Sequence, residues 1–144
     1  MRVRPAVPRD LEAIHAVLHE HGLSTSDVTV ETLNGFLVAV DHKRIVGCVG
    51  VDRYGSVGLL RSLAVRLLER NDGLGHRLLV SVEKRCLADE ISELWLLTTD
   101  APNFFIGAGY RLSARNTAPD DLRATAQFAS ICPASAVCLR KQLC

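Results

Sequence analysis

The chain has 144 residues, close to the commonest size of a single domain, and 48% of them are hydrophobic and 23% charged, which excludes a disordered chain. Its formal net charge of +1 excludes a generic basic nucleic-acid binder. Apolar runs fall short of the ~20 residues that cross a membrane, and no signal-peptide core opens the chain. We therefore expect one cytoplasmic domain over residues 1–144, with neither nucleic acid nor membrane as its partner.

The beginning of the chain predicts a short strand and a helix. Residues 1–5 alternate in polarity as a strand does. Pro8 suits the first turn of a helix and Asp10 suits its dipole. Apolar residues then recur at spacings of three and four until Gly22, which is typical of a helix end.

A hairpin is predicted next. Residues 24–33 are rich in Ser and Thr and read as a loop with one helical turn. The apolar runs 36–40 and 45–52 read as strands, and the charged residues 41–44 join them.

Another strand and a long helix follow. Residues 55–58 form a turn, and 59–65 form a third apolar strand interrupted by Arg61 and Ser62. Residues 70–75 form a glycine-containing turn, after which apolar residues step by four to about residue 88, as in a helix with one buried face.

The last part of the chain predicts a strand at 94–98, a short helix at 101–107, a return to the sheet at 109–112, a helix opening at 119–121 and a closing strand at 134–140. Strands and helices interleaved in this way predict a mixed α/β layer fold with one central sheet.

The turn before the long helix carries the chemistry. Arg70 opens it, and Gly73 and Gly75 follow immediately before the helix. The first N–H groups of a helix have no intrahelical partner, so with the helix dipole they form a site for a phosphate or diphosphate. Glycines let an anion approach the backbone, and an arginine adds a charge-assisted contact. A tight turn without a ligand would explain the turn by itself equally well, and its spacing fits neither a Walker motif nor a dinucleotide fingerprint.

Arg70, Gly73 and Gly75 resemble the R/Q-x-x-G-x-G/A motif of GNAT acetyltransferases. The segment 62–65 resembles the strand before that motif, and 98–110 resembles the closing segment of the family. The opening of the chain, residues 2–11, resembles the first strand and helix. The resemblance covers nearly the whole chain and implies the acyl-CoA N-acyltransferase fold, with a mostly antiparallel central sheet and helices on both faces. It also implies acetyl-CoA as co-substrate and direct transfer to an amine. Because the five cysteines contain no CxxC pair, we expect no metal.

The resemblance implies a set of cofactor contacts. Backbone N–H groups of one strand would hold the pantetheine arm and polarise the thioester carbonyl. Those of the turn would take the diphosphate, and two residues of the short helix would flank the arm. The residues are Leu63, Ala64, Val65, Arg70, Asn71, Asp72, Gly73, Leu74, Gly75, His76, Asn103 and Phe105.

The sequence departs from the family at the general acid. Phe105 stands where the family usually has a tyrosine, so either the thiolate leaves unassisted, or Tyr54 or a water acts as the acid. Asp52 is the first candidate for the base that accepts the proton of the amine, and Glu31 is the second. Glu31 lies within the loop that usually sets specificity in the family, so it is also a candidate for binding the substrate. A solvated charge explains either carboxylate equally well.

Arg61 interrupts an apolar strand beside this predicted site. Its planar guanidinium could bind the carboxylate of a substrate. Alternatively, it lies on the outward face of the strand and pairs with a neighbouring carboxylate of the chain.

A narrower resemblance concerns residues 58–65, 123–128 and 132–136, which are similar to the GNAT branch found with arsenic-resistance operons. It implies an amino-acid-like substrate, or an organoarsenical. A module that binds acetyl-CoA or senses arsenicals is the alternative, motivated by Cys132, Cys138 and Cys144, although chance spacing explains these cysteines too. An enzyme for protein N-termini or lysines is a third hypothesis. Many family members form homodimers, and residues 119–140 could serve that purpose.

Overall fold

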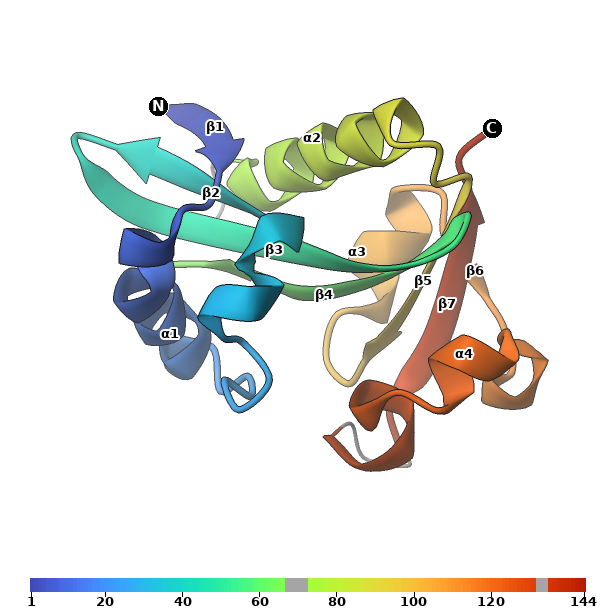
Figure 1. Ribbon diagram of the computed structural model, residues 1–144. Coiled ribbons are helices and arrows are strands. Elements are labelled where there is room, and N and C mark those ends of the chain that lie inside the picture. The colour runs from blue at the N-terminus through green and yellow to red at the C-terminus, as the bar shows by residue number, and fades with distance from the viewer. Residues whose placement is uncertain (67–72, 132–134) are drawn as a thin grey trace. The chain divides into compact units, whose positions relative to one another are not determined.

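The computed structural model describes residues 1–66, 73–131 and 135–144, except for the side chains of residues 130 and 131. The chain divides into two compact units. The first unit holds Met1–Asp52 and Leu60–Arg85, and the second holds Arg53–Leu59 and Cys86–Cys144. Figure 1 labels the elements of both.

The first unit contains most of the long elements. They are β1 (Arg2–Pro5), α1 (Leu11–Glu20), β2 (Phe36–Asp41), β3 (Arg44–Tyr54), β4 (Val57–Val65) and α2 (Leu74–Ala88). Two 3-10 turns, η1 (Pro8–Asp10) and η2 (Val30–Gly35), precede α1 and β2. The last residues of β3, the first of β4 and the end of α2 belong to the second unit.

The strands of the first unit are ordered β1-β2-β3-β4, and β1, β2 and β3 pair antiparallel. Phe36 and Val38 of β2 alternate with Leu37 and Ala39, so the two faces of the strand are both apolar and both buried. A strand buried on both faces needs a covering layer on each side.

Helix α1 covers one face. Its residues Ile14, Val17 and Leu18 have no solvent exposure and form a core with side chains from β2, β3 and β4. Burying each such side chain contributes about 1.5–3 kcal/mol. Figure 1 shows α1 and α2 on opposite sides of these strands.

Helix α2 covers the other face. A Cβ atom built on Gly47 of β3 would lie 2.9 Å from Leu78 Cδ1 and 3.1 Å from the carbonyl oxygen of Ala64. Any larger residue would push α2 from the sheet, so Gly47 permits the close approach of helix and strand. This arrangement confirms helices on both faces.

The second unit is built around β5 (Glu93–Thr98), β6 (Arg111–Leu112) and β7 (Val137–Gln142), with the helices α3 (Pro102–Gly107) and α4 (Asp120–Arg123) and the π-helical turn η5 (Gln127–Ile131). The short 3-10 turn η4 (Arg115–Thr117) precedes α4. Its strand order is β4-β5-β7-β6. The β4–β5 pair is parallel and its ladder joins 57–59 to 93–95, while β7 pairs antiparallel with β5 and β6.

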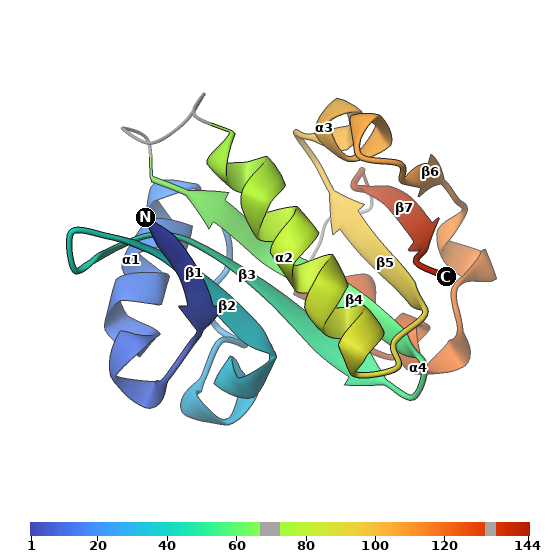
Figure 2. The same cartoon turned by 90° about the horizontal axis from the view of Figure 1, so that it is seen from above.

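The two faces of β5 and β7 bury different groups. On one face Trp95 and Cys138 pack with Leu122 of α4. On the other, Lys141 extends over the ring of Tyr110 at 5.4 Å and donates a hydrogen bond to the carbonyl of Ala108 at 2.9 Å. Figure 2 shows α3 beside β6 and β7, which it contacts.

These elements confirm the predicted mixed α/β fold with a mostly antiparallel sheet. The helix predicted to open at 119–121 ends after one turn, at Arg123, because Thr125 Oγ1 donates to the carbonyl of Leu122 at 2.6 Å and so competes with the helix. The closing strand begins at Val137 rather than at 134. In the described ranges, no helix combines the length and the apolar character needed to cross a bilayer.

Candidate functional site

Strand β4 has an unusual backbone at its centre. Ser62 adopts φ 58°, in the left-handed region, although it lies inside a strand and is not glycine. Such a residue costs about 1–3 kcal/mol and persists only where its surroundings impose it, most often at functional sites. Its carbonyl accepts a hydrogen bond from the buried Cys48 thiol at 3.3 Å.

The start of α2 is open on the side of Gly73. This residue has φ 73°, and a Cβ atom built there would meet no atom within 4 Å. Leu74 is 2% exposed and so anchors the first turn in the core. Gly75 was predicted to end the turn before the helix, but α2 begins at Leu74, so Gly75 lies inside its first turn. His76 is exposed. The predicted contacts Arg70, Asn71 and Asp72 lie outside the described residues.

The strand that leads to this turn ends in Leu63, Ala64 and Val65. Ala64 packs into the core beneath α1. Because successive side chains of a strand point to opposite faces, Leu63 and Val65 face the other side. The Nε2 atom of His21 lies 3.0 Å from the carbonyl oxygen of Val65 and 3.4 Å from its amide nitrogen. No local pattern indicates that His21 reaches this strand, because the two are far apart in the chain.

A buried arginine joins two carboxylates in the same unit. Arg61 Nη1 donates to Asp52 Oδ2 at 3.0 Å, and Arg61 Nη2 forms an ion pair with Asp27 Oδ1 at 2.5 Å. The Arg61 side chain is 4% exposed, whereas those of Asp27 and Asp52 are each 24% exposed. The guanidinium also lies 5.8 Å from the centre of the Phe36 ring. We call these three charged residues the Arg61 cluster.

The Arg61 cluster bears on two alternatives that the sequence left open. Arg61 is paired with carboxylates of the chain, but it is buried and does not lie on an outward face. Asp52 is held by Oδ2, and in the part of the chain that the structure describes its other oxygen has no hydrogen bond. Asp27 was not singled out in the sequence, because it lies in a loop without periodicity.

Glu31 accepts hydrogen bonds from groups outside the Arg61 cluster. It is exposed in η2, where its own backbone amide and the hydroxyl of Thr29 donate to the carboxylate and hold its pKa below the usual value. These local hydrogen bonds favour a role in the turn itself, so its predicted role in binding substrate stays a prediction.

The remaining candidates lie in the second unit. Tyr54 is half-buried and packs against the cluster around Trp95. Phe105 is 6% exposed, and its ring meets that of Tyr110 edge-on at 5.6 Å. Asn103 is exposed on α3. The roles predicted for these residues toward a cofactor stay predictions.

Among the cysteines, Cys48, Cys86 and Cys138 are buried and Cys144 is exposed, while Cys132 lies outside the described residues. Burial raises the pKa of Cys48 to about 12 and that of Cys138 to about 11. Over residues 1–66, 73–131 and 135–144, no three His, Cys, Asp or Glu side chains gather as a metal site would require.

Residues 9–110 match the model of the acetyltransferase (GNAT) family, which is well over half of the chain. No curated protein sequence matches significantly.

Several solved structures share the fold. N-acetylglutamate synthase from Neisseria gonorrhoeae, complexed with coenzyme A and N-acetyl-glutamate, is 22% identical with a TM-score of 0.86, over 99% of this chain and 35% of that chain. Rv2747 from Mycobacterium tuberculosis, in complex with CoA and NLQ, is 17% identical with a TM-score of 0.84, over 100% of both chains. The PaiA N-acetyltransferase from Thermoplasma acidophilum, in complex with coenzyme A, is 17% identical with a TM-score of 0.71, over 98% of both chains. The present chain therefore spans about a third of the Neisseria synthase.

Proposed function

The chain belongs to the GNAT acetyltransferase family, and we propose that it moves the acetyl group of acetyl-CoA to the primary amine of a small, amino-acid-like acceptor by direct transfer. The observation that carries this proposal is the carboxylate of Asp52 on β3, which the buried Arg61 of the neighbouring strand β4 holds. Strand β4 then leads toward the open first turn of α2.

The first turn of α2 fits a diphosphate. The helix has 15 residues, so its dipole is substantial, and the N–H groups of Leu74, Gly75 and His76 have no carbonyl acceptor within the helix. The space beside Gly73 is open and leaves room for an anion. A side chain at this position would fill that space. Acetyl-CoA, when bound, supplies the acetyl group as a thioester. Arg70, Asn71 and Asp72 are expected to contribute to the same contacts.

The end of β4 would hold the arm of the cofactor. The left-handed Ser62 changes the course of the strand just before Leu63, so backbone N–H groups there are directed differently from those of a regular ladder. Pre-oriented N–H donors of this kind stabilise the negative charge that develops on a carbonyl oxygen. The amide nitrogen of Val65 lies 3.4 Å from Nε2 of His21, so His21 competes with the cofactor for this donor. The role of Asn103 and Phe105 rests on the family resemblance.

Asp52 is the proposed base. An alkyl amine with a pKa near 10 is mostly protonated at pH 7, so a group must accept its proton before attack. Arg61 fixes one carboxylate oxygen of Asp52 and leaves Oδ1 for the ammonium group or for a bridging water. Arg61 is therefore a positioning residue, and it could bind an acceptor carboxylate only by giving up an aspartate.

No hydroxyl is available at Phe105 to protonate the leaving group. A thiol with a pKa of about 8.5 leaves as a thiolate without much assistance. Tyr54 or a water stays the proposed acid if one is needed. We further propose that residues 1–144 act as one cytoplasmic catalytic domain and that residues 119–140 support a homodimer, both by analogy with the family.

The cofactor site is tested by acetyl-CoA binding to Gly73→Glu. A glutamate there would place a negative charge and a bulky side chain at the proposed diphosphate, so binding should be lost. Acetyl-CoA at 100 times its dissociation constant should stabilise the wild-type protein by about 2.7 kcal/mol in thermal unfolding. Gly22→Glu is the matched control, because Gly22 has φ 72° and also no atom within 4 Å of a built Cβ. Unchanged affinity in Gly73→Glu would refute this placement of the diphosphate.

The acceptor is identified by measuring CoA release with amino acids, their phosphinic and arsonic analogues, simple amines and peptides. Transfer to amino acids or their analogues supports the proposed class, and an organoarsenical in that set would support the narrower arsenic-resistance assignment. Transfer to peptides alone would favour the protein N-acetyltransferase hypothesis.

A module that senses arsenicals without efficient catalysis is the second candidate. Cys144 is exposed, but Cys138 is buried with a raised pKa, so its thiolate is unfavourable as an arsenic ligand. Acetyl-CoA binding without CoA release across the whole panel, together with stoichiometric arsenite binding, would favour this candidate.

A further inference from the structure

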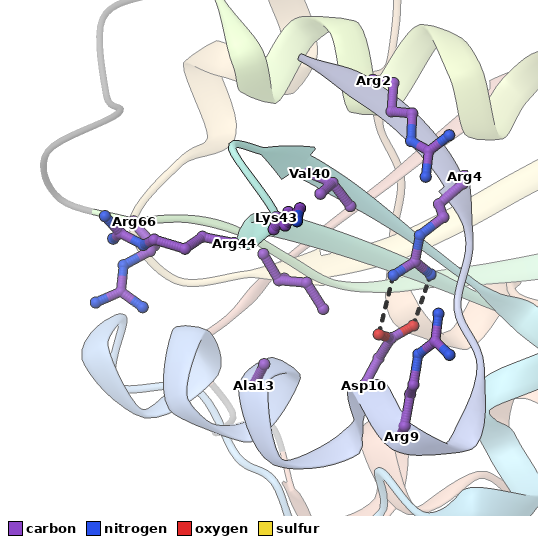
Figure 3. A pocket seen from close by; sticks show the side chains of 10 residues that line it. Arg2, Arg4, Arg9, Asp10, Ala13, Val40, Lys43, Arg44 and Arg66 are labelled. Carbon is purple, nitrogen blue, oxygen red and sulfur yellow. Dashed lines mark hydrogen bonds and ion pairs between the residues drawn. The ribbon is translucent and has the colours of Figure 1, made fainter.

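The first unit has a basic cavity that the proposed transfer reaction does not use. It has a volume of about 500 Å³, within the usual range for sites that hold small molecules. Among the described residues that line it, Arg2, Arg4, Arg9, Lys43, Arg44 and Arg66 are cationic and Asp10 alone is acidic (Figure 3). We call it the Arg2–Arg66 cavity.

This concentration of charge does not follow from the composition. The whole chain has 17 Lys and Arg against 16 Asp and Glu. With six cations and one carboxylate in the Arg2–Arg66 cavity, the rest of the chain has 11 Lys and Arg against 15 Asp and Glu and is acidic. Like charges gathered on a protein that is otherwise slightly acidic repel one another, so they destabilise the empty cavity.

The single carboxylate is fully engaged. Arg4 binds Asp10 through both nitrogens, at 2.7 and 3.0 Å, and the amide of Val7 donates to the same carboxylate at 2.8 Å. Figure 3 shows the two Arg4 contacts as dashed lines on Asp10. Arg66 reaches Glu20 of α1 at 3.7 Å. Arg4 and Arg66 thus each have an acidic partner, while the other four cations of the cavity outnumber its acidic groups.

The other cations lack such partners. Within the described ranges of the chain, Arg2, Lys43 and Arg44 make no hydrogen bond or ion pair through their side chains. All three are exposed at the rim, whereas Ala13, Val40 and Ile45 line the cavity with apolar surface. Rim cations around a partly apolar floor suit a small organic anion with several charged groups.

The backbone of the hairpin between β2 and β3 supports a binding role for its basic side chains. His42 and Lys43 have φ 49° and 65°, the left-handed pair of a tight hairpin turn, which asparagine and glycine favour most. The turn between β3 and β4 has a glycine, Gly55, at φ 68°. In the β2–β3 turn the chain instead keeps two basic side chains at strained positions, where they line the cavity or the smaller hollow beside it.

We propose that the Arg2–Arg66 cavity binds a small anion carrying two or more phosphate or carboxylate groups, at a site separate from that of acetyl-CoA. The site is built from β1, η1, the start of α1 and the β2–β3 hairpin. Of its cations, only Arg66 follows β4, the strand assigned to the cofactor. The anion neutralises Arg2, Lys43 and Arg44 and so relieves their mutual repulsion.

The test is isothermal titration with inorganic tripolyphosphate and, in a parallel arm, with citrate. The first variant combines Arg2→Gln, Lys43→Gln and Arg44→Gln. The matched control combines Lys84→Gln, Arg111→Gln and Arg123→Gln, which removes the same charge from exposed positions elsewhere. We expect the first variant to weaken binding at least tenfold and the control less than twofold, and the stronger of the two arms tells whether phosphate or carboxylate groups are preferred.

A repeat of the titration in saturating acetyl-CoA separates the two sites. Undiminished binding of tripolyphosphate or citrate supports the proposal. The proposal is overturned if neither anion binds, if both triple variants lose affinity equally, or if acetyl-CoA displaces the anion. It is also overturned if the first variant weakens acetyl-CoA binding as strongly as it weakens anion binding.

Discussion

Two clusters in the first unit pair arginine with aspartate and reach opposite charge balances. In the Arg61 cluster one buried guanidinium serves two carboxylates. In the Arg2–Arg66 cavity one buried carboxylate, Asp10, serves Arg4 while further cations surround it. The Arg61 cluster therefore has a net negative charge, and the Arg2–Arg66 cavity has a net positive charge.

The difference shows how the same ion pair can prepare opposite chemistry. Surplus carboxylate beside a fixed arginine suits the acceptance of a proton, and surplus arginine around a fixed carboxylate suits the binding of an anion. In each case the buried partner sets the geometry and the more exposed groups meet the ligand.

The largest effect is expected for Asp52→Asn. It keeps the shape of the side chain but removes the proposed base, so kcat/KM for acetyl transfer should fall by about 10²–10⁴-fold. The fall should be smallest at high pH, where the amine is neutral without help. Asp27→Asn is the matched control, since it removes the other partner of Arg61 and should cost less than about tenfold. Equal losses in the two variants would show that both aspartates only stabilise Arg61.

A smaller effect, on stability, is expected for Asp10→Asn. Arg4 would lose the carboxylate that it pairs with among the described residues, and Arg4 and the amide of Val7 would share one acceptor oxygen in place of two. Unfolding should therefore become easier by about 2–3 kcal/mol. Asp27→Asn should cost about 1 kcal/mol, because Arg61 keeps Asp52 and the pair is partly exposed. Urea unfolding of both variants measures the difference, and a larger loss in Asp27→Asn would contradict this account.

The same comparison has a pH dependence. Hydrogen bonds from Arg4, and secondarily from the amide of Val7, lower the pKa of Asp10 below its usual value. A lowered pKa in the folded protein contributes stability that is present above the pKa of the unfolded chain and is lost as the pH falls through the folded pKa. The gap between wild type and Asp10→Asn should therefore be constant near neutral pH and shrink below about pH 4. A gap that stays constant into acid would mean that the carboxylate charge is not what stabilises η1.

The smallest effect is expected for Lys43→Gly. Glycine tolerates the left-handed conformation at this position, so the variant should gain about 0.5 kcal/mol of stability while losing affinity for tripolyphosphate. Gly55→Ala, at a similar φ in the next hairpin, should lose about 1 kcal/mol. A loss of stability in Lys43→Gly would show that Lys43 makes contacts that strengthen the turn.

Much of the fold could be predicted from the sequence because its signals are local. Periodicity of the apolar residues located α1, α2 and the strands from β1 to β5 within a few residues. The opening of α4 after Pro119 was predicted as well, whereas its end was not, since the sequence pattern does not show that Thr125 ends the helix. The R/Q-x-x-G-x-G/A motif indicated the family, although Arg70 itself lies outside the described residues.

The candidate site was predicted only in part. Asp52 and Arg61 were singled out separately, one as a base and the other as a ligand for substrate, and the structure brings them together with Asp27. The contact of His21 with Val65 and the gathering of Arg2 with Arg66 gave no signal in the sequence. The residues involved are separated by 44 and 64 positions, and neither periodicity nor a motif links residues so far apart.

The sequence by itself determined the elements, the family and the glycines at the start of α2, because each depends on neighbours within a few residues. Only the tertiary structure decided which charges meet. Strand pairing places β3 beside β4 and β1 beside β2 of the β2–β3 hairpin, and long-range pairing of strands sets distances that local spacing does not contain. The charge balance of the Arg61 cluster and of the Arg2–Arg66 cavity is therefore a property of the folded chain.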